Sequence, residues 1–298
     1  MRRPKDHGFT LIELIAVILI VGIIVAVAGF NIARPILGFV DTTRRVGLVD
    51  GADTALNRLT REARLALPNS LRISGTALEF LRTRTGGRYR AALAPVGASD
   101  PLNLAATSDS FDVIGELKQF GQIQASGGAT TTTCLADPTV DCMVLFNTGN
   151  PPVTSAADCV GLADTNAYCG DNVAAVDSFN TVFRTLTFRH DPGNAFPFAS
   201  PNQRFHIVDT PVSYVCDLGT GELQRFDRYA ITAAQPTSPP GGVTPSVLVD
   251  DVVSCQFTYN PGSASRAGLL TVRLTVADAN AVGEQVSIVQ QIHIPNVP

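Results

Sequence analysis

The chain begins with a long apolar segment that carries a single charge. From Leu14 to Ala33 there are twenty residues without an ionisable side chain, and Arg34 and Pro35 end the run. A bilayer-spanning helix needs about 20 mainly apolar residues. The sequence therefore predicts a membrane-spanning helix here, and the basic leader Arg2, Arg3 and Lys5 predicts that its N-terminus stays in the cytoplasm.

A helical pattern resumes after Pro35. Apolar residues recur there at steps of three and four, which defines one face of an amphipathic helix: Val49, Ala52, Leu56, Leu59, Ala63 and Ala66. Pro68 is expected to end this helix, and Pro35 to mark a bend or soft point within it.

Beyond Pro68 the apolar period changes to two, which is typical of strands. The predicted strands are Leu71–Ser74, Leu78–Arg82, Arg88–Leu93, Ser110–Leu117, Met143–Asn147, Asn180–His190, Arg204–Cys216, Leu223–Ile231, Val247–Tyr259, Leu270–Ala277 and Gln285–Ile294. Residues 121–141 and 148–178 lack a clear period and are expected to be loops. Val272, Leu274 and Val276 alternate with polar residues, as in an antiparallel sheet with one buried face. The expected class is α+β, one long helix packed on antiparallel sheet.

Glu13 stands at the start of the apolar segment, where an isolated charge costs at least about 2.5–3.5 kcal/mol. Three interpretations compete. A secretory signal has a shorter apolar region of about 7–15 residues and a cleavage site after it. A plain signal anchor fits the length but leaves the carboxylate unexplained. A signal that is cut before the helix explains both, because the helix and its charge are then retained.

The residues Gly8-Phe9-Thr10-Leu11-Ile12-Glu13 resemble the processing site of type IV pilin-like proteins. The resemblance implies that a prepilin peptidase cleaves the Gly8–Phe9 bond and that the new amine of Phe9 is N-methylated. It also implies that Glu13 neutralises an N-terminal amine, its own or a neighbour's, in a filament core. The charge would then be paired, and breaking such a buried pair leaves an uncompensated charge.

The C-terminal half refines the resemblance. Val212-Ser-Tyr-Val-Cys-Asp217, Gly221-Glu-Leu-Gln-Arg-Phe226 and the ending Gln290-Gln-Ile-His-Ile-Pro-Asn-Val-Pro298 are similar to the MshO family of minor pilins, which help to build mannose-sensitive haemagglutinin (MSHA) pili. The GspJ pseudopilins of type II secretion are a more distant resemblance. The chain departs from major pilins in lacking a proline within the apolar helix.

This resemblance implies a non-enzymatic minor pilin that primes or caps pilus assembly. The alternatives are a type II secretion pseudopilin and a tethered adhesin or enzyme. The implied partners are the prepilin peptidase/methylase, other major and minor pilins and the inner-membrane assembly platform. The implied location is the inner membrane, as a single-pass protein with a periplasmic head, and later the pilus or pseudopilus. The expected divisions are a leader 1–8, a membrane or filament helix 9–34, its continuation 35–68 and a β-rich head 69–298.

Charge and cysteine content fit an exported protein. Loss of residues 1–8 would move the net charge from −4 to −6, because the leader holds three basic residues and one acidic residue. An acidic chain gives no support to a nucleic-acid surface. All six cysteines lie in the predicted exported part, which favours disulfides. We expect the pairs Cys216–Cys255, Cys134–Cys142 and Cys159–Cys169.

The sequence offers little catalytic chemistry. It lacks the Gly-x-Ser-x-Gly, His-Glu-x-x-His and phosphate-loop patterns, and we expect no cofactor and no metal. The histidines are His7 in the leader, His190, His206 and His293. Of these, His206 is expected to face solvent.

Three further groups are interpreted as surface features: Gly86-Gly87 as a hairpin turn, Arg82, Arg84, Arg88 and Arg90 as a basic cluster across it, and Asp250-Asp251 as strand neighbours on opposite faces. Asp158, Asp164, Asp171 and Asp177 could offer oxygen ligands to calcium, although solvated loop acids are the favoured interpretation.

Overall fold

The computed structural model describes residues 9–95, 97, 99–118, 120–149, 152–159, 165–263, 266–278 and 284–297, with the backbone alone for 29–37, 40, 41 and 120. The chain divides into two compact units, Met1–Asp50 and Gly51–Pro298. The architecture is α+β, an N-terminal apolar helix with a large antiparallel β domain, as the sequence predicts.

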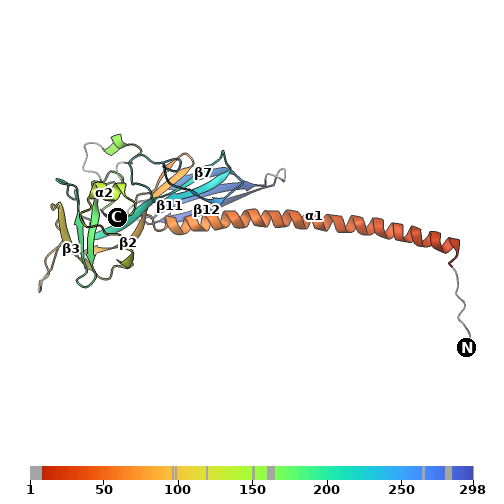
Figure 1. Ribbon diagram of the computed structural model, residues 1–298, viewed down its shortest axis with the longest axis horizontal. Helices are drawn as coiled ribbons and strands as arrows, with labels where there is room; N and C mark the ends of the chain where they lie inside the picture. The colour runs from red at the N-terminus through yellow and green to blue at the C-terminus, as the bar shows by residue number, and fades with distance from the viewer. Residues whose placement is uncertain are drawn as a thin grey trace, which may run out of the picture. The chain divides into compact units, whose positions relative to one another are not determined.

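Helix α1 spans Leu11–Ala63 and is helical through Pro35 (Figure 1). It ends five residues before Pro68, because the ring of a proline clashes with the carbonyl four residues earlier, at Arg64. After Ala63 the chain joins the sheet, where the Leu67 N–H donates to the Leu81 carbonyl. In the larger unit the helix buries one face: Ala52, Ala55, Leu56, Leu59 and Ala63. Val49 shares their spacing but is 38% exposed.

Nine strands form the larger sheet, in the order β1-β2-β3-β6-β5-β4-β7-β8-β9, with every pairing antiparallel. Their bounds are Arg72–Ser74 (β1), Ala77–Tyr89 (β2), Ser108–Ile114 (β3), Cys142–Leu145 (β4), Val173–Asn180 (β5), Thr185–Arg189 (β6), Arg204–Asp217 (β7), Glu222–Asp227 (β8) and Ser246–Val249 (β9). An additional pairing of β2 with β7 closes β2, β3, β6, β5, β4 and β7 into a ring. The head therefore holds a small closed barrel, with β1 joined to β2, and β8 and β9 extending from β7.

Aromatic and aliphatic side chains from all six ring strands form one buried cluster. Phe111, Phe188 and Phe205 are each fully buried, and the ring centroids of Phe111 and Phe205 lie 5.2 Å apart in an edge-to-face arrangement. Small barrels are filled in this way by their inward-facing side chains. A second buried cluster includes Cys134 of α2 (Thr131–Ala136), together with Val173 and Ala175 of β5.

A separate three-stranded antiparallel sheet has the order β10-β11-β12: Val252–Asn260, Gly268–Ala277 and Gln285–Ile294. Leu270, Val272, Leu274 and Val276 of β11 are fully buried and alternate with more exposed residues, as their sequence pattern predicts. Short 3₁₀ turns lie at Phe120–Gln122 and Ala156–Cys159.

The predicted hairpin at Gly86-Gly87 is wrong. Both glycines lie inside the continuous strand β2, where Gly86 pairs with His206 and Gly87 with Phe205 of β7. A Cβ on Gly86 would lie 2.9 Å from the Phe205 carbonyl oxygen, and one on Gly87 would lie 3.1 Å from the Phe205 ring. These glycines therefore permit a close approach of strands rather than a turn.

Two predicted strands contain turns. Of Asn180–His190 only Thr185–Arg189 forms strand β6, and Asn180 is the last residue of β5; between them the Asn180 side chain accepts hydrogen bonds from the N–H groups of Val182 and Phe183 and so forms a turn. Val247–Tyr259 breaks at Asp250-Asp251, where Asp251 has a φ of 58°. These two aspartates are therefore exposed loop residues between β9 and β10 and not strand neighbours.

The two predicted loops are also wrong in part. Residues 121–141 contain helix α2, and residues 148–178 contain most of β5. The first four residues of β5, Val173–Val176, form a continuous buried Val/Ala run with no alternation. A strand buried on both faces has this appearance, and it cannot be found from a period of two.

Candidate functional site

The start of α1 exposes an apolar surface on every side. Leu11–Ala28 has a mean hydropathy of 3.2, and none of these 18 residues is buried. Phe9 and Leu11 are each 78% exposed and Ile12 is 75% exposed. The segment is long and apolar enough to cross a membrane. Apolar surface of this extent is unfavourable in water, so a membrane or neighbouring helices must cover it.

Glu13 lies in the first turn of α1 and is exposed. Its backbone N–H donates to the Thr10 hydroxyl oxygen at 3.4 Å, and that hydroxyl donates to Glu13 Oε2 at 3.5 Å. Both contacts are long, but the spacing Thr-x-x-Glu at a helix start is that of a capping box. A carboxylate in the first turn also interacts favourably with the helix dipole. Glu13 thus has a local partner, Thr10, that sequence reasoning missed although the spacing was visible.

Gly8, the residue before the predicted cleavage, lies outside the described residues, as does His7. Phe9, the predicted first residue of the processed chain, precedes the helix. Phe9 thus lies four residues before Glu13 in the chain, with Thr10 between them.

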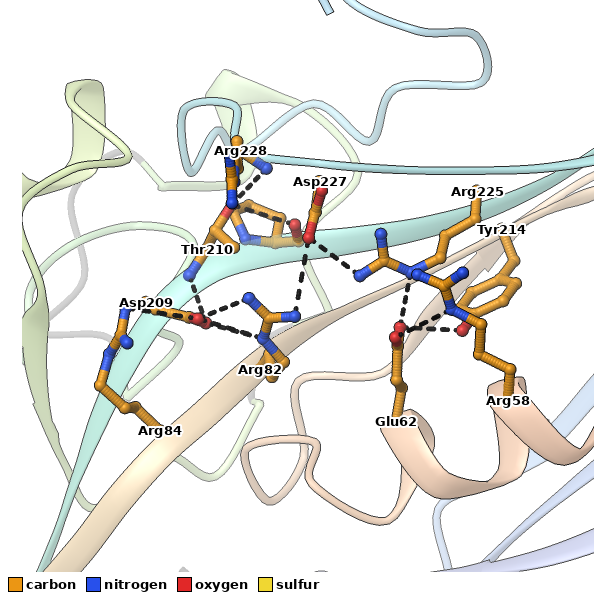
Figure 2. A network of polar contacts seen from close by, with 11 residues as sticks. Arg58, Glu62, Arg82, Arg84, Asp209, Thr210, Tyr214, Arg225, Asp227 and Arg228 are labelled. Carbon is orange, nitrogen blue, oxygen red and sulfur yellow. Dashed lines mark hydrogen bonds and ion pairs between the residues drawn. The ribbon is translucent and has the colours of Figure 1, made fainter. Parts of the chain in front are cut away.

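A polar network holds the end of α1 to the head (Figure 2). Glu62 accepts hydrogen bonds from the Tyr214 hydroxyl at 2.8 Å and from Arg225 Nε at 2.7 Å, and its other oxygen lies 3.4 Å from Arg58 Nε. Arg225 also donates to Asp227 at 2.9 Å. Burial alone would lower the pKa of Arg225, but the hydrogen bonds to Asp227 and Glu62 outweigh it and raise that pKa. The contacts join helix, β7 and β8.

The predicted basic cluster across a hairpin is wrong in its placement, because the hairpin is absent, and each of the four arginines has a partner. Arg82 donates to both oxygens of Asp209, at 3.1 and 2.6 Å, and Arg84 Nε lies 2.9 Å from Asp141 (Figure 2 shows Arg82 and Arg84 on either side of Asp209). Arg88 donates to the Asn202 carbonyl, and Arg90 pairs with Asp112 at 2.9 Å. Without the hairpin turn, Arg82, Arg84 and Arg88 lie along β2 and Arg90 directly follows it. Arg82 and Arg84 both contact Asp209, whereas Arg88 and Arg90 have partners of their own.

Two buried carboxylates depend on arginines. Burial raises the pKa of Asp141 to about 6, against the opposing effects of the Gln124 N–H and of Arg84. Burial likewise raises the pKa of Glu79, which accepts from Arg72 Nε at 2.7 Å and from the Tyr229 hydroxyl at 3.0 Å. The Arg72 guanidinium in turn lies 3.6 Å from the centroid of the Tyr168 ring. These pairs are inside the head and fix its loops.

His206 does not face solvent as predicted. It lies on β7 between β2 and β4, paired with Gly86 and Val144, so it is largely covered. Burial and the nearby Arg204 lower its pKa to about 4. His190 is buried beside the rings of Phe188 and Phe196, and burial lowers its pKa too. His293 is exposed on β12.

The described aspartates that were considered as calcium ligands make local polar contacts, and Asp177 lies on β5 and not in a loop. Asp158 accepts from the N–H groups of Thr154 and Ser155, and these bonds lower its pKa. Asp177 accepts from the Gly128 N–H and lies 3.5 Å from Arg189. Asp164 lies outside the described residues, and Asp171 has a partner. Over the part of the chain that the structure describes, no group of three or more His, Cys, Asp or Glu residues is placed to hold a metal ion.

The three disulfides are Cys134–Cys142, Cys159–Cys169 and Cys216–Cys255, the pairs that the sequence predicts. The first two close short loops. Cys216 lies on β7 and Cys255 on β10, so the third joins the nine-stranded sheet to the three-stranded one.

Comparison with protein-family models matches residues 3–29 to the prokaryotic N-terminal methylation motif. No curated protein and no solved structure matches the chain. The motif is the prepilin signal of type IV pilin-like proteins, and it implies processing by a prepilin peptidase and assembly with other pilins. It covers the leader and the exposed apolar part of α1 and leaves the head without a match.

Proposed function

We propose that this chain is a non-enzymatic minor pilin that primes or caps assembly of a type IV, MSHA-like pilus. One observation carries the proposal: a methylation motif at residues 3–29 is followed by an apolar helix with no buried residue over Leu11–Ala28. A helix that is apolar on all sides and exposed over this span needs other molecules to cover its surface. Its use is therefore to enter a membrane first and a bundle of similar helices later.

Processing creates the charge that Glu13 needs. Cleavage between Gly8 and Phe9 exposes an amine four residues before Glu13, and N-methylation leaves that amine positive. The carboxylate then pairs with the amine of its own chain or of a neighbour. In a low-dielectric bundle, removing one partner of a buried pair costs about 3–5 kcal/mol, so the pair fixes the axial position of the subunit.

The proposed location is the inner membrane, with a single span and the head in the periplasm, followed by the pilus. Three disulfides and no free cysteine suit an oxidising compartment. The proposed partners are the prepilin peptidase/methylase, the other pilins and the inner-membrane assembly platform.

The size of the head supports a minor role. Beside the strands next to the end of α1, it carries a closed six-stranded barrel with its own core. A barrel of this kind on every subunit would have to be accommodated at each repeat along a shaft. On a subunit present in few copies, at an end of the filament, it has room.

Glu13 variants in the native host test the proposal. Glu13→Gln keeps a side chain that suits the capping position but removes the charge, whereas Glu13→Ala removes both. We expect both variants to be cleaved normally and to fall at least about tenfold in the sheared pilus fraction, as 1.4 kcal/mol already corresponds to tenfold. The measurement is an immunoblot of pilus and membrane fractions. Thr10→Val, which weakens the cap alone, is the matched control and should incorporate. Wild-type incorporation of Glu13→Gln would contradict charge pairing.

The same helix would serve a type II secretion pseudopilin. Deleting the chain and measuring surface pili beside secreted proteins separates the two functions. Fewer pili with normal secretion is the result expected for the minor pilin. Lost secretion with normal pili would replace the proposal by the pseudopilin.

A further inference from the structure

A cleft of about 620 Å³ lies between β1 and β10, which are edge strands of the two sheets. The three residues of β1 line one side of it, and Phe257, Thr258 and Tyr259 of β10 line another. Tyr168 and Gln235 complete the part of the lining that matters here. The volume falls in the range of about 300–1,000 Å³ that is usual for sites of small ligands.

The lining of this cleft is both aromatic and polar. The rings are those of Tyr168, Phe257 and Tyr259. Neutral amide and hydroxyl side chains come from Asn69, Ser74, Asn166, Gln235 and Thr258. Ser74 and Thr258 are exposed, and no described residue forms a hydrogen bond with either hydroxyl. The cleft therefore offers apolar rings together with polar groups that are free to bind a ligand.

The charge of the lining argues against an anionic ligand. Arg72 is the only charged residue among the described residues that line the cleft. Its Nε donates to Glu79 at 2.7 Å, and its other two nitrogens donate to the carbonyls of Ala233 at 2.5 Å and Thr232 at 2.8 Å. The guanidinium is thus neutralised by a buried carboxylate and held by the head itself, so the ligand that the cleft suits is uncharged.

The spacing of the two edges argues against an inserted peptide strand. A strand that pairs on both sides needs its neighbours about 9.6 Å apart, which is twice the usual strand spacing of about 4.8 Å. Strands β1 and β10 come within 8 Å of each other at Cα. Their edges are therefore too close to receive a strand between them, although their free N–H and C=O groups can still bind a smaller polar ligand.

We propose that the cleft between β1 and β10 binds an uncharged saccharide. A sugar ring has faces of C–H groups, which pack against the electron-rich faces of aromatic rings. Its rim carries hydroxyls, which both donate to and accept from amides, hydroxyls and free backbone groups. Such a ligand matches the rings, the neutral polar groups and the absence of free charge among the described lining residues. The site adds ligand recognition by the head to the assembly role proposed above.

Binding of the full chain to a glycan array tests the site. The chain is solubilised in a detergent without a sugar headgroup, so that the detergent cannot occupy the cleft. The array carries neutral oligosaccharides beside sialylated and sulfated ones. We expect the chain to bind a subset of the neutral oligosaccharides, and calorimetric titration with the best of them then gives a Kd for comparing variants.

Two tryptophan variants make the test specific to the cleft. Thr258→Trp places a bulky ring in the cleft from β10 and is expected to weaken binding of the neutral oligosaccharide at least about tenfold. Gln256→Trp is the matched control, because Gln256 is exposed on the same strand two residues earlier and does not line the cleft. Aromatic residues suit strand positions, and thermal unfolding shows whether both variants fold.

Several results would overturn the proposal. These are binding to no neutral oligosaccharide, binding to sialylated or sulfated glycans alone, and an equal Kd for Thr258→Trp and Gln256→Trp. Because the cleft is in the head, Glu13→Gln should bind the neutral oligosaccharide as the wild type does. Failure of this variant to enter pili is therefore distinguishable from failure of the saccharide site.

Discussion

At the residue scale, the head contains titratable side chains whose charged forms are disfavoured by burial. His206 lies on β7 between two strands, and its Nε2 has no hydrogen-bond partner among the described residues. Asp141 is fully buried, with a pKa raised to about 6. Both groups titrate between pH 4 and 6.5, with opposite effects on stability. Only a comparison of variants that keep Asp141 isolates the histidine.

Acid should destabilise the head through His206. The unfolded chain binds a proton near the ordinary histidine pKa of 6.5, and the folded chain only near about 4. Between these values the unfolded state holds more protons, so the free energy of unfolding rises with pH. On acidification from pH 7 to 4, the wild type should lose up to about 3 kcal/mol more than His206→Gln. Denaturant unfolding of the detergent-solubilised chain at several pH values measures this, with His293→Gln as the exposed control. Parallel pH profiles for wild type and His206→Gln would contradict burial of this ring.

At the element scale, strand β2 joins the closed barrel to the part of the nine-stranded sheet that extends beyond it. Its first half pairs with β1 and the C-terminal half of β7, and its second half enters the barrel beside β3 and the N-terminal half of β7. Gly86 and Gly87 lie against Phe205 of β7, where a Cβ on either would be too close to its neighbours. Their absence of a Cβ is therefore a condition for closing the barrel.

Gly86→Val should destabilise the head. Its Cβ would lie 2.9 Å from the Phe205 carbonyl oxygen and 3.1 Å from His206 Nδ1, and a strand backbone cannot move away without breaking the ladder. Overpacking of this kind costs about 1–3 kcal/mol or more. The matched control is Gly241→Val, where a Cβ meets nothing within 4 Å. Thermal unfolding followed by circular dichroism compares them; equal midpoints would mean that Gly86 is in a turn after all.

The elements that sequence reasoning found are those whose pattern is local. The alternation in β11 and the 3–4 spacing of Ala52, Leu56, Leu59 and Ala63 each identify a buried face without knowledge of the partner. Gly86-Gly87 has the local appearance of a turn, and only the approach of β7, more than a hundred residues away, makes it strand. Strand β5 was missed because burial on both faces removes alternation. The pairing of β2 with β7 and the closed ring are long-range features that no local pattern contains.

The candidate site was also predictable only in part. Gly8, Phe9 and Glu13 are recognisable because the processing motif is contiguous in sequence. The partners of Arg82, Arg84 and Glu62 are not, because these pairs join residues far apart in the chain, as Arg82–Asp209 does across 127 positions. A cluster of charged residues in the sequence therefore does not predict whether those side chains are paired or unpaired in the folded head.

At the scale of the whole molecule, the chain combines an N-terminal helical segment that cannot bury its own surface with a disulfide-bonded head that can. The first requires a membrane or other helices. The head folds around its own cores and is cross-linked by three disulfides. An assembly protein needs both properties, a segment that joins the assembly and a head that gives it its particular role.

Mass spectrometry of the protein extracted from membranes of its native host tests the central claim most directly. If the chain is a processed pilin-like subunit, its N-terminal peptide begins at Phe9 and carries one methyl group on the amine. Loss of residues 1–8 with retention of Leu11–Ala28 is then seen in the intact mass. A chain that begins at Met1, or one cut after Ala33, would contradict the account.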